Sequence, residues 1–242
     1  MKAILLAAGR GTRISRMIEN VPKCTLPIMN QPLIRRSVEC LLNRGMQVAV
    51  CVGYQHKKVM EALAGLDVSY YLNPFYEVTN SIASLWLARD FIDDECLIMN
   101  ADVYWTEKIL DAVLSDKNDV VLSIDKSRTH VGDYFFQTAG DCIRKYGKNL
   151  PIEERSGEYV GLAKITKCFV PQFLRRMEDI IEDQGYDKWW ENVLYSFTDE
   201  RNIYTLDVNG EFWAEVDYYD DYERILSFVD NASSVRICSQ HV

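Results

Sequence analysis

A loop of small and basic residues follows the first apolar run of the chain. The run covers residues 2–7, and the sequence soon continues as Gly9-Arg10-Gly11-Thr12-Arg13. Ligands of open α/β sheets bind at the carboxyl ends of strands, where glycines let backbone N–H groups approach an anion. The two arginines would supply positive charge. The segment therefore predicts a phosphate-binding loop, with a purely structural glycine turn as the alternative.

Two common phosphate-binding motifs do not match this loop. The dinucleotide fingerprint needs a third glycine where Ile14 stands, and no acidic residue clearly ends the second apolar run. A P-loop needs Gly-Lys-Ser/Thr, which does not follow. The sequence therefore argues against an NAD-linked oxidoreductase and against a P-loop enzyme.

A lysine follows the loop in a stretch that two prolines stiffen. Residues 21–28 read VPKCTLPI, which places Lys23 between the prolines. Together with LAAGRGTR at 6–13, this stretch resembles the signature of the nucleotidyltransferases that join a nucleoside triphosphate to a phosphorylated small molecule. The resemblance implies that the loop wraps the triphosphate, while Lys23 and Arg13 act as catalytic cations. The residues it assigns to the triphosphate are Leu6, Ala7, Ala8, Gly9, Arg10, Gly11, Thr12, Arg13 and Lys23.

Three carboxylates resemble the metal-binding positions of the same family. Asp102 follows an apolar run in the sequence NAD, and WAEVDYYDDYERI at 213–225 contains Glu215 and Asp217. Alternate side chains of an extended segment point the same way, so Glu215 and Asp217 should face one side. Mg²⁺ prefers such oxygen ligands and binds substrate phosphates as well. The resemblance therefore implies a Mg²⁺ site at these three residues, with a solvated strand face as the alternative for the last two.

Residues 79–88, TNSIASLWLA, resemble the choline-phosphate and aminoethylphosphonate cytidylyltransferase branch of the family. Sugar-phosphate relatives usually carry a Gly-Thr-Ala-type stretch there. The resemblance assigns Thr79, Asn80 and Ser81 to the base or ribose. Asn80 or Ser81 would serve equally well as the N-cap of the following helix.

The acceptor site is expected in the second half of the chain. The stretch 143–165 also resembles this branch, and its Lys148 suits an acceptor phosphate. An acceptor with an ammonium head would need a carboxylate and aromatic faces. The candidates for acceptor binding are Lys148, Glu158, Tyr159, Gly161, Trp189, Trp190 and Glu191.

These residues must be positioned by an α/β fold. Apolar runs at 2–7, 47–52, 68–72, 95–100 and 120–124 read as strands, and 32–44 and 81–91 carry helical spacing between them. Continuous apolar strands are typical of a sheet covered on both faces. The second half reads as strands at 133–138, 159–166 and 202–208, with helices at 167–183, 187–197 and 219–229.

The expected architecture is a Rossmann-like (GT-A-type), doubly wound mixed sheet with a small lateral α+β part. We expect a single nucleotidyltransferase domain over 1–232. Its nucleotide-binding half is about 1–125, and its acceptor and second metal-ligand half is about 126–232. Residues 233–242 have little periodicity and are predicted to be a tail.

Composition narrows the class of partner. The net charge of −9 argues against broad nucleic-acid or anionic membrane binding, and no apolar stretch is long enough to cross a bilayer. The N-terminal run breaks too early for a signal peptide. Seven cysteines without a C-x-x-C pair and three scattered histidines predict a reduced, cytoplasmic protein without structural zinc. A homodimer is left open.

The resemblance implies a Mg²⁺-dependent transfer of CMP from CTP to a small phosphate or phosphonate monoester, with release of pyrophosphate. No complete choline box matches residue by residue. Phosphocholine, 2-aminoethylphosphonate, another phosphorylated amine or alcohol, and a phosphorylated amino acid therefore all remain acceptors. One alternative is a sugar-1-phosphate nucleotidyltransferase that uses UTP or dTTP. The alternative of another class is a non-catalytic nucleotide-binding regulatory domain.

Overall fold

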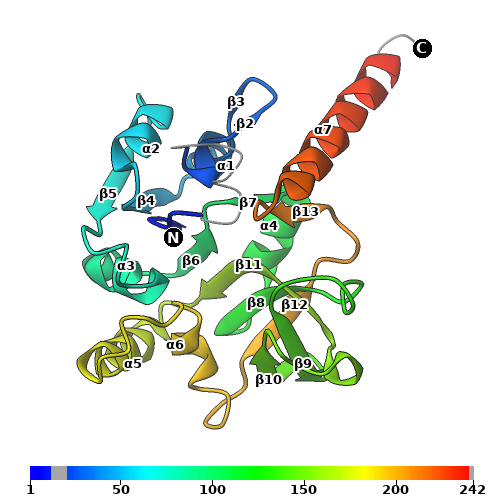
Figure 1. The fold of residues 1–242 in the computed structure, drawn as a ribbon. Coiled ribbons are helices and arrows are strands. Elements are labelled where there is room, and N and C mark those ends of the chain that lie inside the picture. Colours follow the sequence, from blue (N-terminus) through cyan, green and yellow to red (C-terminus); the bar gives the residue numbers. More distant parts are fainter. Residues whose placement is uncertain (12–20, 240–242) are drawn as a thin grey trace.

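A mixed β-sheet runs through the centre of the computed structural model, which describes residues 1–11 and 21–239 (Figure 1). Within this part of the chain the sheet has nine strands. Three predicted strands match the structure residue for residue, namely those at 2–7, 47–52 and 68–72. In spatial order the strands are β5 (Val68–Leu72), β4 (Gln47–Val52), β1 (Lys2–Ala7), β6 (Cys96–Asn100), β11 (Gly157–Ile165), β8 (Val120–Asp125), β12 (Tyr204–Asp207), β10 (Cys142–Gly147) and β9 (Phe135–Ala139).

Helices cover both faces of the sheet, as the continuous apolar strands predict. Ala3, Leu5 and Ala7 of β1 join one buried cluster, whereas Ile4 joins another on the opposite face. Helices α1 (Leu33–Leu42), α2 (His56–Ala62) and α4 (Glu107–Ser115) supply the first cluster. Helices α3 (Ser81–Leu87), α5 (Val170–Glu182) and α6 (Asn192–Tyr195) supply the second. The doubly wound mixed sheet is therefore confirmed.

Strand β11 lies between the two halves of the sheet. Two other strands, β6 and β9, pair with different parts of it. Its C-terminal part pairs antiparallel with β6 from Leu162 onward, and its first two residues pair with β9. The β11–β8 register shifts between Tyr159 and Ala163, where Gly161 has a φ of +92° that a side chain would rarely adopt. Strand β9 also pairs with β10, which forms the lateral part of the fold. An opening therefore remains beside β11, between the end of β6 and the start of β9.

Two short strands bring distant acidic segments together. Strand β13 (Trp213–Glu215) pairs antiparallel with β7 (Val103–Trp105), so Glu215 lies opposite Val103. The Val216 N–H donates to the Asp102 carbonyl over 3.0 Å. A third cluster of buried side chains holds the adjoining helix α7 (Tyr219–Ser239) against β13 and the hairpin of β2 (Pro27–Ile28) and β3 (Gln31–Pro32).

Two expectations about helices were wrong. The helix predicted at 187–197 is only the short α6, because the backbone of 186–190 instead meets the start of α3. There the Asn80 N–H donates to the Tyr186 carbonyl over 2.9 Å, and the Trp190 N–H donates to the Ser81 hydroxyl over 2.9 Å. The helix predicted at 219–229 ends too early, because α7 continues to Ser239, within the predicted tail 233–242. Its sequence has no glycine or proline to end the helix, although its apolar periodicity fades.

No helix in the described ranges 1–11 and 21–239 is long and apolar enough to cross a membrane.

Candidate active site

A cavity of about 330 Å³ lies at the carboxyl ends of β1 and β6, next to the opening beside β11. Such an edge is where open α/β sheets bind ligands. Most of the residues predicted for the site line this cavity. They are Leu6, Ala7, Ala8, Gly9, Gly11, Lys23, Thr79, Asn80, Ser81, Asp102, Lys148, Glu158, Tyr159, Trp189, Glu191, Glu215 and Asp217.

Other predicted residues lie elsewhere. Arg10 is exposed and forms an ion pair with Glu77 at 3.6 Å, outside the cavity lining. Trp190 is fully buried in the core, and Gly161 forms the bulge of β11 rather than part of the lining. Thr12 and Arg13 lie outside the described residues.

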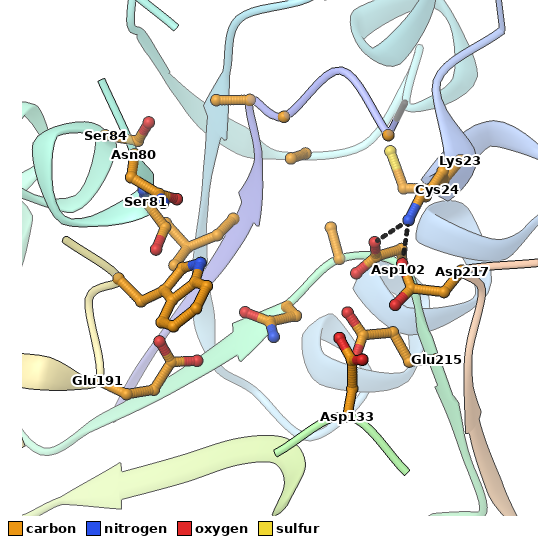
Figure 2. Close-up of a pocket in the computed structure, with 18 of the residues that line it drawn as sticks. Lys23, Cys24, Asn80, Ser81, Ser84, Asp102, Asp133, Glu191, Glu215 and Asp217 are labelled. Carbon is orange, nitrogen blue, oxygen red and sulfur yellow. Dashed lines mark hydrogen bonds and ion pairs between the residues drawn. The ribbon is translucent and has the colours of Figure 1, made fainter. Parts of the chain in front are cut away.

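Lys23 is held between two carboxylates of the cavity (Figure 2). It starts a short 3₁₀ turn over Lys23–Thr25, which Pro22 precedes in extended conformation. Its Nζ donates a hydrogen bond to Asp217 and lies 3.8 Å from the nearer Asp102 oxygen. Burial alone would lower the pKa of Lys23, but the two carboxylates outweigh it and raise this pKa above its usual value. Lys23 is therefore a fixed positive charge at neutral pH.

Gly11 makes room for this lysine. Its φ is +60°, and a Cβ placed on it would lie 2.6 Å from Cε of Lys23. Only glycine meets both requirements at little cost. The second glycine of the loop thus allows the aliphatic part of Lys23 to pass against the loop backbone.

The cavity carries more carboxylates than cations. Glu215 faces it together with Asp102 and Asp217, and burial followed by repulsion from these two carboxylates raises the pKa of Glu215 well above its usual value. Among the described residues, the carboxylate and lysine side chains that line the cavity are those of Asp102, Asp133, Glu158, Glu191, Glu215, Asp217, Lys23 and Lys148. A triphosphate added here would meet repulsion unless more positive charge came with it.

This donor set suits a magnesium ion. Among residues 1–11 and 21–239, no group of three or more His, Cys, Asp or Glu side chains is arranged to hold a metal ion by itself. Mg²⁺ needs no such group, because it usually binds through one or two carboxylates, several waters and substrate phosphates. Asp102 and Asp217, with Glu215 beside them, would offer those carboxylates.

The predicted nucleotide side is built on the start of α3. Asn80 is the N-cap of this helix, and its side chain accepts the Ser81 N–H over 2.8 Å. Thr79 is fixed by Asn73, a buried residue that the sequence interpretation missed and whose amide donates to Thr79 and Ser84 over 3.0 and 2.9 Å. The capping role is confirmed for Asn80, and the same residue also lines the cavity.

The predicted acceptor side contains a second charge network. Lys148 forms an ion pair with Asp133 at 2.9 Å and lies 4.9 Å from the ring centre of Trp189. Glu158 pairs with Arg128 and accepts the Asp133 N–H over 2.9 Å. Glu158 is therefore already satisfied by the fold and holds the segment that carries Asp133.

Sequence interpretation missed three lining residues on this side, Asp133, Tyr134 and Tyr195. Tyr134 and Tyr195 stack with ring centres 5.6 Å apart, and Trp189 meets Tyr134 edge-on at 5.8 Å. Asp133 and Tyr134 begin the predicted strand at 133–138 and lie just before β9, so their position at the start of a strand was the available signal. The aromatic residues form one wall of the cavity.

Known proteins are similar to this chain over most of its length. A model of the MobA-like NTP transferase domain matches residues 3–195. The CTP:phosphoglutamine cytidylyltransferase of Campylobacter jejuni is 26% identical, over 92% of this chain and 98% of that protein. The choline-phosphate cytidylyltransferase of Haemophilus influenzae is also 26% identical, over 93% of this chain and 96% of that protein.

Solved structures share the fold. The CTP:phosphocholine cytidylyltransferase from Streptococcus pneumoniae superposes with a TM-score of 0.77 at 21% identity, over 94% of this chain and 98% of that chain. The inositol-1-phosphate CTP transferase from T. maritima gives a TM-score of 0.75 at 20% identity, over 93% of this chain and 94% of that chain.

Proposed function

This chain belongs to the MobA-like NTP transferase domain family, and we propose that it is a cytidylyltransferase acting on a small phosphate or phosphonate monoester. The observation that carries the proposal is the cluster of Lys23, Asp102 and Asp217 beside the glycine loop. Relatives that align over nearly the whole chain are named as cytidylyltransferases, which supports CTP as the nucleotide.

The proposed reaction brings two anions together. An oxygen of the acceptor phosphate attacks the α-phosphorus of CTP, and pyrophosphate leaves from the opposite side, so that one P–O bond forms as another breaks. Such a transfer depends on positioning and charge neutralisation more than on an acid–base residue. Two unit anions about 4 Å apart repel by roughly 4 kcal/mol at an effective dielectric of 20.

The chain's own residues would lower this repulsion in two places. Lys23 stays protonated and fixed beside the glycine loop, where the triphosphate is expected. Lys148 lines the same cavity beside Trp189 and would attract the acceptor phosphate. Asp102, Asp217 and Glu215 would hold Mg²⁺, which when bound supplies positive charge to the reacting phosphates.

A nucleotide and acceptor panel tests the proposal. The protein is incubated with Mg²⁺ and each of CTP, UTP, dTTP, ATP and GTP, together with phosphorylated amines, alcohols, amino acids and sugars. Pyrophosphate release and product mass are measured. We expect a CDP-linked product with CTP. A UDP- or dTDP-sugar as the main product would establish the sugar-1-phosphate alternative, and no pyrophosphate with any pair would leave only a nucleotide-binding role.

A further inference from the structure

Glu191 is a buried carboxylate without a cationic partner among the described residues. Its exposed fraction is 7%, and it lies near the side chains of Asn100 and Trp190, of which the Trp190 indole N–H donates to Asn100 over 3.4 Å. Both lysines of the described cavity lining are engaged elsewhere, Lys23 with Asp217 and Lys148 with Asp133. A buried carboxylate is costly unless a positive charge compensates it. A bound ligand is therefore the natural source of that charge.

The hydroxyl of Tyr159 is a second unsatisfied group in the same wall. Its oxygen is buried and has no hydrogen-bond partner within the described structure, and Glu191 acts electrostatically on it. Leaving a buried hydroxyl without a partner costs free energy that a ligand can recover. The residue lines the cavity, as Glu191 does.

The aromatic wall favours a cation of a particular kind. Tyr134, Trp189 and Tyr195 line the cavity next to Tyr159, and aromatic faces attract any organic cation. A quaternary ammonium would gain from these faces but has no N–H to offer. A primary or secondary ammonium gains from them as well and also donates to the carboxylate and the hydroxyl, and such charge-assisted hydrogen bonds are the stronger ones.

Building on the proposed function, we infer that the acceptor is a phosphorylated primary or secondary amine whose N–H groups bind between Glu191 and Tyr159. Figure 2 shows Glu191 on the side of the cavity with Asn80 and Ser81, away from Lys23. Asn100, which lies near Glu191, is two residues from Asp102, and two residues of backbone span at most about 7 Å. Glu191 therefore lies near the end of β6 that Asp102 follows.

Matched acceptors test the inference. The probes are 2-aminoethyl phosphate, its N-methyl derivative, choline phosphate and the uncharged propyl phosphate. Binding is measured by calorimetry, and turnover with CTP is measured by pyrophosphate release. We expect 2-aminoethyl phosphate to bind on the order of tenfold tighter than propyl phosphate and more tightly than choline phosphate. Equal or tighter binding of choline phosphate, or equal binding of propyl phosphate, would overturn the inference.

Variants assign the effect to the two residues. Glu191→Gln should bring the affinity ratio of amine to propyl phosphate close to one, and Tyr159→Phe should lower it by a smaller factor. Glu178→Gln, on the exposed face of α5, is the matched control and should keep the wild-type ratio. An unchanged ratio in Glu191→Gln, or weaker CTP binding alone, would remove Glu191 from the amine site. The acceptor series on the wild-type protein decides the matter even if a variant does not fold.

The ratio of the affinities for 2-aminoethyl phosphate and propyl phosphate is measured by calorimetry and does not depend on turnover. If no acceptor releases pyrophosphate with CTP, the proposed function fails, while the preference for amines is still measured. If propyl phosphate is turned over as well as the amines, the proposed function stands and this inference fails.

Discussion

The ammonium of Lys23 donates a hydrogen bond to the carboxylate of Asp217, a residue 194 positions further along the chain. Asp102 lies 3.8 Å from the same ammonium. The contact ties the segment after the glycine loop to the connection between β13 and α7. Lys23 therefore has a fixed position before any nucleotide binds.

Replacement of Lys23 should cost turnover far more than stability. In Lys23→Ala the cavity loses its fixed cation beside the loop, and kcat/KM for pyrophosphate release should fall by on the order of 10²–10³. Lys57→Ala, on the exposed side of α2, is the matched control. A folded Lys23→Ala protein with near-normal turnover would take Lys23 out of the mechanism.

The carboxylates should set the magnesium requirement. Asp102→Asn and Asp217→Asn each remove one anionic oxygen ligand, so the Mg²⁺ concentration for half-maximal turnover should rise by about tenfold or more. The measurement is a Mg²⁺ titration of pyrophosphate release, with chelation by EDTA as the zero point. Asp220→Asn, which alters an exposed acid in the first turn of α7, should behave as wild type. A Mg²⁺ midpoint that does not move in either variant would argue against this metal site.

Local motifs predicted well which residues line the cavity next to the glycine loop. The glycine loop, Lys23 and Asp102 each stand next to an element whose apolar pattern is plain in the sequence. Glu215 and Asp217 were predicted by their own spacing and the resemblance, and both face the cavity. These features are short motifs of consecutive residues, so they can be recognised in the sequence without knowledge of the tertiary structure.

The acceptor side depended on contacts that no local pattern contains. The opening beside β11 arises because β6 and β9 pair with different parts of this strand. Arg128 takes Glu158 as its partner, although Glu158 also lines the cavity, and the approach of 186–190 to α3 buried Trp190 in the core. Such pairings follow from how distant strands meet, and periodicity cannot specify them.

Gly11→Ala should impair catalysis through Lys23. Its Cβ would lie 2.6 Å from the lysine chain, and the positive φ adds a backbone cost of about 1–2 kcal/mol. We expect turnover to fall by on the order of tenfold or more, because a misplaced catalytic group loses much of its effect. Gly65→Ala is the matched control, since Gly65 has a φ of +82° but nothing within 4 Å of its added Cβ. Equal turnover in the two variants would show that strain alone, and not contact with Lys23, matters.

Glu191 should make the protein less stable as the pH rises. Burial raises the pKa of this carboxyl to about 7 in the folded chain, against a usual value of 4.5. A raised folded-state pKa contributes stability that is present below the unfolded value and is lost as the pH rises through the folded one. Glu191→Gln removes this dependence, so the free energy of unfolding of the variant relative to wild type should rise by on the order of 2 kcal/mol between about pH 5.5 and about pH 8.5. Urea unfolding of both proteins at the two pH values measures it, and Glu178→Gln should show no such trend. A difference between Glu191→Gln and wild type that stays constant with pH would mean that Glu191 is ionised in the folded chain across this range and that another group supplies its positive charge.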